Sequence, residues 1–155
     1  MSPASSAPRG GRSGRAVRGL ARLLAAAGPA VDAAVHARLA GPYDAVVAGI
    51  SQGVLFRVES GLAALAALLV LVWRHPRGDA FALLVAAGGL AVLVLYTAVG
   101  IGQLGPVPDM YYPVWTGDKK LVAASQIVTV LATGFLLLTG RRRPDPGYAG
   151  ALPVT

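Results

Sequence analysis

The chain contains no cysteine, and charged and aromatic side chains are scarce. The absence of cysteine excludes disulfides, thiol catalysis and thiolate metal sites. Charged residues make up only 14% of the sequence, against about 25% in soluble domains. We also find no Ser–His–acid grouping, phosphate-binding loop or metal-ligand spacing. The sequence therefore offers no catalytic residues, no metal ligands and no cofactor motif, and no enzymatic activity is evident from it.

Long apolar runs take the place of chemical motifs. Residues 80–101 and 121–140 carry no charge, and a third apolar run ends at Trp73. An α-helix needs about 20 apolar residues to cross the hydrocarbon core of a bilayer, which is about 30 Å thick. Hydrophobic residues make up 55% of the chain, and its many glycines and alanines suit closely packed membrane helices. We therefore predict an all-α, multi-pass membrane protein.

The net charge of +7 is concentrated at the ends of the apolar runs. Arg74 and Arg77 precede the second run, and residues 141–143 are three arginines after the last one. This placement is typical of topology control and of attraction to anionic lipid headgroups, so we expect a bilayer rather than nucleic acid as the partner. We expect no cleavable signal peptide, because no compact apolar core with a small-residue cleavage site follows the basic N-terminus.

With three crossings, the arginine-rich N-terminus would lie opposite the other basic clusters, against the positive-inside rule. A fourth crossing over residues 20–37 removes this conflict, although that segment includes Arg22, Pro29, Asp32 and His36. The charge pattern favours an integral membrane four-helix bundle in the plasma membrane, with both termini cytoplasmic.

The alternative is three transmembrane helices plus an N-terminal interfacial helix. In that arrangement, one face of the interfacial helix would be basic and the opposite face apolar. The residues concerned are Arg15, Arg18 and Arg22 on the first face, and Val17, Leu20 and Leu24 on the second.

The predicted organisation has three parts. Residues 1–15 form a disordered basic cytoplasmic tail, 16–143 the transmembrane helical domain, and 144–155 a flexible cytoplasmic tail. A tight turn at 75–78 separates the second and third helices, and residues 39–49 and 102–118 form the outer loops. The four helices are expected at about 20–37, 50–73, 80–102 and 119–140.

Each predicted helix carries a polar residue at a similar depth in the outer half of the bilayer. With a rise of 1.5 Å per residue, Asp32 lies about 8–9 Å below the outer end, and Arg57, Tyr96 and Gln126 about 10 Å below it. Glu59 lies at about 13 Å. Such groups are costly in lipid, so they should face inward and pair.

We expect a bridge between Asp32 and Arg57, since Arg57 and Glu59 point about 200° apart on their helix. Glu59 then needs a donor such as Tyr96 or Gln126, or is protonated. The favoured interpretation of this polar layer is a structural clasp that sets helix register. The alternative is a small binding or proton-handling site that opens outward.

The second outer loop, 102–118, contains three prolines and a group of aromatic residues. Tyr111, Tyr112 and Trp115 suit the headgroup level of a bilayer, so an interfacial anchor is the favoured interpretation. The alternative is a lid in which Asp109 or Asp118 meets a ligand. His36 and His75 are expected at opposite membrane faces, which excludes a bis-histidine haem or metal pair.

Three stretches resemble known patterns: GISQGVLFRVES (49–60), GQLGPVPDMYYPVW (102–115) and KKLVAASQ (119–126). They resemble small actinobacterial four-helix membrane proteins of unassigned function. In those proteins the first pattern opens the second helix, and the proline-rich aromatic pattern precedes the fourth. The resemblance implies four crossings and carries no known activity.

The leading expectation is therefore a small multi-pass membrane protein with a structural, accessory or partner-binding role. Its partner would be a second copy or another membrane protein. A redox or quinone-linked component of DoxX-like type is an alternative that rests on fold-level analogy. A small oligomeric transporter that uses the polar layer is another alternative.

Overall fold

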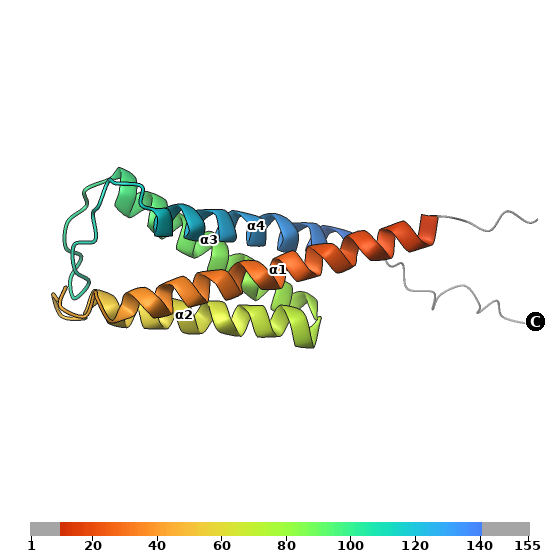
Figure 1. The fold of residues 1–155 in the computed structure, drawn as a ribbon, viewed down its shortest axis with the longest axis horizontal. Coiled ribbons are helices and arrows are strands. Elements are labelled where there is room, and N and C mark those ends of the chain that lie inside the picture. The colour runs from red at the N-terminus through yellow and green to blue at the C-terminus, as the bar shows by residue number, and fades with distance from the viewer. Residues whose placement is uncertain (1–9, 141–155) are drawn as a thin grey trace, which may run out of the picture.

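The computed structural model describes residues 10–140, and all regular elements in this range are helices. In chain order they are α1 (Gly10–Ala40), α2 (Gln52–Leu68), the π-helical segment η1 (Leu69–Trp73), α3 (Pro76–Ala98) and α4 (Gly117–Gly140). The helices lie side by side and alternate in direction (Figure 1). The all-α prediction is confirmed.

The two ends of this assembly differ in the segments that they contain (Figure 1). The start of α1, the turn between η1 and α3, and the end of α4 lie at the same end, which we call the terminal end, and α1 extends beyond the other two. Loops 41–51 and 99–116 lie together at the other end, which we call the loop end. The connectivity thus follows the alternation that was predicted for four successive helices.

Three helical stretches are long and apolar enough to cross a membrane: Gln52–Trp73, Pro76–Ala98 and Gly117–Gly140. They contain 22, 23 and 24 residues, respectively. The three apolar spans predicted from the sequence are therefore confirmed as helices of sufficient length. Helix α1 has 31 residues but falls outside this set, because charged residues are distributed along it.

Helix α1 nevertheless packs into the assembly, mainly against α2 and α4. A Cβ atom added at Gly28 would lie 2.1 Å from Thr129 Oγ1 and 2.7 Å from the carbonyl oxygen of Ser125, so α1 and α4 are in close contact. The apolar core is built largely from alanine, which permits such close approach. Its members are Ala21, Ala25, Ala26, Ala66, Val70, Ala82, Ala132 and Leu136.

The helix bounds differ from prediction mainly at the starts of α1 and α3. Helix α1 begins at Gly10, so residues 10–15 of the predicted disordered tail are helical, whereas 1–9 and 141–155 lie outside the described residues. Helix α3 begins at Pro76 rather than residue 80, because proline suits the first helical turn and the His75 side chain accepts a hydrogen bond from the Arg77 N–H. It ends at Ala98 rather than 102.

Helix α2 ends in a π-helical turn. The backbone N–H of Arg74 donates to the carbonyl of Leu69, five residues earlier, at 3.3 Å. In an α-helix the same N–H would bond to Val70, so the Val70 carbonyl is left open to another donor. Arg74 then leaves the helix in the left-handed conformation, with φ of 49°.

Candidate functional site

The centre of the polar layer is Asp32 of α1, which is only 2% exposed. Gln126 Nε2 of α4 donates to Asp32 Oδ1 at 3.3 Å. His36, one turn further along α1, places Nδ1 3.2 Å from the same oxygen and stacks edge-on against Phe56 of α2. The structure therefore brings two members of the predicted polar layer, Asp32 and Gln126, into contact and adds His36 to the layer.

Glu59 of α2 and Gln126 converge on a glycine of α3. A Cβ atom added at Gly89 would lie 2.5 Å from Gln126 Nε2 and 2.8 Å from Glu59 Oε1. Glu59 Oε1 and Gln126 Oε1 are both buried and lack a hydrogen-bond partner. Both atoms are acceptors when Glu59 is ionised, and a proton on Glu59 would supply one donor. The polar layer thus uses side chains of α1, α2 and α4 over Gly89 of α3.

The predicted bridge between Asp32 and Arg57 is wrong. Arg57 donates from Nη1 and Nη2 to the two carboxylate oxygens of Asp44, at 2.7 and 2.5 Å. Arg57 lies near the start of α2 and points away from Glu59, because residues two apart face nearly opposite sides of a helix. It therefore reaches the exposed loop after α1, where its guanidinium lowers the pKa of Asp44.

Tyr96 is buried on α3 but does not supply the donor that was expected for Glu59. Its backbone carbonyl accepts a hydrogen bond from the Tyr112 N–H at 3.1 Å. Its hydroxyl does not reach Glu59 Oε1, which is without a partner. Tyr96 therefore ties α3 to the second loop through its backbone.

The aromatic residues of loop 99–116 are exposed at the loop end. The two acidic residues of the predicted lid, Asp109 and Asp118, bind other groups of the protein. Asp109 Oδ1 accepts a hydrogen bond from the Tyr111 N–H at 2.9 Å, and Asp118 forms an ion pair with Arg38 of α1. Trp115 is 45% exposed, and Tyr111 and Tyr112 are similarly exposed. The carbonyl of Pro106 accepts from the N–H groups of Gly49 and Ile50, so the two loops are joined. Both acidic side chains of the predicted lid thus have contacts within the protein.

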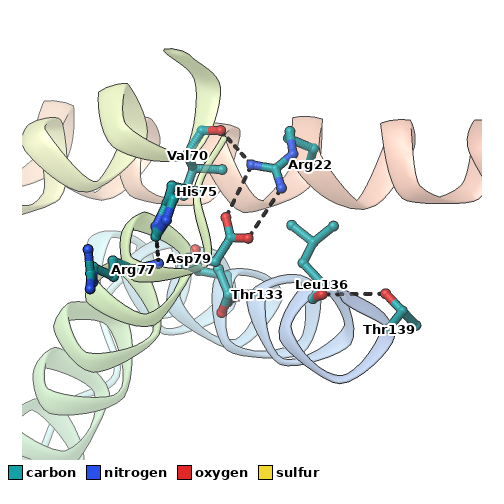
Figure 2. Close-up of polar contacts among 9 residues, drawn as sticks. Arg22, Val70, His75, Arg77, Asp79, Thr133, Leu136 and Thr139 are labelled. Carbon is teal, nitrogen blue, oxygen red and sulfur yellow. Dashed lines mark hydrogen bonds and ion pairs between the residues drawn. The ribbon is translucent and has the colours of Figure 1, made fainter. Parts of the chain in front are cut away.

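A second polar site, which the sequence analysis missed, lies at the terminal end. Arg22 Nη1 and Nη2 each lie 3.2 Å from one carboxylate oxygen of Asp79 (Figure 2). Arg22 Nη1 also donates to the free Val70 carbonyl at 2.8 Å, so it joins α1 to both η1 and α3. Asp79 is 3% exposed and lies in the first turn of α3, where the helix dipole favours a carboxylate.

A signal for this pair was present in the sequence. In the predicted topology, the start of the first helix with Arg22 lies at the same membrane face as the 75–78 turn, and Asp79 directly follows that turn. A lone carboxylate at the start of an apolar helix calls for a cation at the same level. The partner could have been sought among the arginines at that end.

The two histidines lie at opposite ends, as predicted, with His36 toward the loop end and His75 in the turn at the terminal end. Within residues 10–140, no group of three or more His, Cys, Asp or Glu side chains could hold a metal ion. Comparison with protein-family models, curated proteins and solved structures gives no match for this chain. The interpretation of its polar sites therefore rests on their geometry.

Proposed function

We propose that the chain is an integral membrane four-helix bundle of the plasma membrane, with a structural or partner-binding role. All four helices cross the bilayer, and both termini are cytoplasmic. The resemblance to small actinobacterial membrane proteins is consistent with this arrangement. The three apolar helices are long enough to cross on their own, so the proposal depends on α1.

The observation that carries the proposal is the pairing of charged side chains along α1. Arg22 pairs with Asp79 and Asp32 with Gln126, and both contacts are largely buried between helices. Arg38 forms a more exposed ion pair with Asp118 of α4. Intramembrane charges that pair inside a bundle are far less costly than charges that face lipid. Arg18 and Arg38 are about 30 Å apart along the helix, close to the thickness of the hydrocarbon core.

The opposite face of α1 is apolar and exposed, which suits lipid or a membrane partner. Leu23 is 61% exposed and Leu20 is 58% exposed. An apolar face of this kind, on a helix whose Arg22 and Asp32 side chains face other helices, favours a crossing over a helix that lies on the membrane surface. The basic residues at the terminal end support a cytoplasmic location for that end.

Single cysteines test the topology, because the native chain has none. Cysteine at Gly14 or Arg77 should resist a membrane-impermeant thiol reagent in intact cells, while cysteine at Ala45 or Thr116 should react. Reaction at Gly14 together with protection at Arg77 would contradict a crossing by α1. Permeabilised cells serve as the control, in which the terminal-end cysteines should become reactive.

A photo-crosslinking residue at Leu23 tests partner binding on the exposed face of α1. Formation of a discrete protein adduct, of the chain itself or of another membrane protein, would support partner binding. The same variant without irradiation is the control that should yield no such adduct. Lipid adducts alone would exclude a partner on this face and favour a purely structural role.

A second candidate function is proton handling by the polar layer. It is favoured by the two buried oxygens, Glu59 Oε1 and Gln126 Oε1, that lack a donor. In proteoliposomes with an internal pH dye, proton flux that is lost in Glu59→Gln would support this function. Equal and low flux in both proteins would favour the clasp.

A further inference from the structure

Four arginines surround one hollow at the terminal end. The hollow has a volume of about 380 Å³ and lies between α1, the end of η1 and α4. None of the six residues that line it is acidic. They are Arg15, Arg18, Gly19, Arg22, Arg74 and Leu136.

Two of these arginines are held in place by the protein. Arg22 is fixed by Asp79 and by the Val70 carbonyl. Arg18 donates from Nη1 to Thr139 Oγ1 of α4 at 2.6 Å. These contacts fix the sides of the hollow before any ligand arrives. The pairing of Arg22 with Asp79 also offsets one of the four positive charges.

The other two arginines, Arg15 and Arg74, are exposed and have no acidic neighbour in the lining of the hollow. Arg74 has φ of 49°, a conformation in which glycine is the usual residue. The chain therefore keeps a guanidinium at a position where the backbone favours glycine. A residue other than glycine in this conformation carries backbone strain, and such strain is typical of positions where the side chain has a role.

A cluster of guanidinium groups is suited to one ligand chemistry in particular. Arginine binds phosphate oxygens through paired N–H groups, and several arginines around one hollow can share a single phosphate. Leu136, which is 2% exposed, is the one apolar side chain of this lining, and its side chain lies on the side of α4 that faces Arg22 (Figure 2). A phosphate group, either free or in a lipid headgroup, would match the arginine side chains of this lining.

We propose that this hollow binds a phosphate group, either in the headgroup of an acidic phospholipid or as a soluble anion. The site itself follows from the arginine geometry, whereas the lipid as the source of the phosphate rests on the proposed cytoplasmic membrane face. Binding measured on the purified full chain is independent of topology, so failure of the site and failure of the proposed topology are distinguishable.

Tryptophan fluorescence provides a local signal. Trp73 directly precedes Arg74, and Trp115, the other tryptophan, lies at the loop end. In a Trp115→Phe background, the full chain in neutral detergent would be titrated with short-chain phosphatidylglycerol, short-chain phosphatidylcholine or inorganic phosphate. We expect saturable binding of phosphatidylglycerol that is tighter than binding of phosphatidylcholine.

Arginine variants locate the binding. Arg15→Gln and Arg74→Gln should each weaken phosphatidylglycerol binding about fivefold, which corresponds to about 1 kcal/mol per basic residue. Arg77→Gln is the matched control, because Arg77 is an exposed arginine in the same turn that does not line the hollow. Arg74→Gly should also weaken binding while keeping the melting temperature, because glycine adopts positive φ without strain.

The outcomes distinguish a lipid site, a site for a soluble phosphate and the absence of a phosphate site. Binding of phosphatidylglycerol but not of inorganic phosphate, with the arginine dependence above, supports a lipid site. Equal, arginine-dependent binding of inorganic phosphate supports the same site with a soluble ligand. No saturable binding of either probe, or an equal loss in Arg74→Gln and Arg77→Gln, would overturn the proposal.

Discussion

Arg22 and Asp79 form a two-point ion pair at 3.2 Å that links α1 to α3, although these helices otherwise share few contacts. The side chains are 12% and 5% exposed, so the pair is largely shielded from solvent. Arg22 also completes the hydrogen bonding of the π-helical turn through Val70. This one side chain thus connects α1, η1 and α3 at the terminal end.

Loss of either partner of this pair should be strongly destabilising. Arg22→Leu or Asp79→Leu leaves an uncompensated charge, and we expect a loss of about 3–5 kcal/mol in the free energy of unfolding in detergent. The double Leu variant should lose less than the sum, because it leaves neither charge behind. Denaturant unfolding of the four proteins measures the coupling, and strictly additive losses would contradict the pairing.

A side chain at Gly89 should displace the ends of the Gln126 and Glu59 side chains. A Cβ atom there would overlap Gln126 Nε2 and Glu59 Oε1, so Gly89→Ala should lower the unfolding free energy by about 1–3 kcal/mol. The neighbouring Gly88 has nothing within 4 Å of an added Cβ and provides a matched control. Gly88→Ala should be neutral or slightly stabilising, because alanine favours helix. Equal melting temperatures for the two variants would show that Gly89 is not a contact point.

Replacing Glu59 by glutamine tests the donor shortage in the polar layer. The amide of Glu59→Gln adds N–H donors near the buried Gln126 Oε1, so the melting temperature in detergent should stay the same or rise. Gln126→Glu has the opposite effect on the number of donors, because it removes the amide that donates to Asp32. We expect it to cost about 1–3 kcal/mol, because it removes one hydrogen bond to Asp32 and places a second carboxyl group beside that of Asp32. A marked loss of stability in Glu59→Gln would argue that the charge on Glu59 is needed.

The pair between Asp44 and Arg57 should make a small, pH-dependent contribution. The Arg57 guanidinium lowers the pKa of Asp44 from its ordinary value of 3.8. A group with a lowered pKa in the folded state contributes stability above its ordinary pKa and loses it as the pH falls toward the folded value. Stability in detergent should therefore fall less between pH 5 and pH 3 in Asp44→Asn than in the native chain. Arg57→Gln should match Asp44→Asn, and an unchanged pH profile in both would exclude the effect.

The positions of polar residues along each helix could be predicted from the sequence, but their partners could not. A constant rise per residue placed Asp32, Glu59 and Gln126 at similar depths, and these three do gather around one level. The partner of Asp32 depends on which helices are neighbours and how each is rotated. Because α1 packs against α4, Gln126 reaches Asp32, while Arg57 turns toward the loop.

The sequence by itself determined the three apolar helices, the loops between them and the ends at which the basic residues gather, because these depend on local composition. Tertiary structure alone decided the Arg22–Asp79 pair, the closeness of Gly89 to Gln126, and the ring of arginines around one hollow. Each of these joins residues far apart in the chain. Their distances follow from the packing of alanine and glycine faces, which fixes how closely the helices approach and how they are rotated.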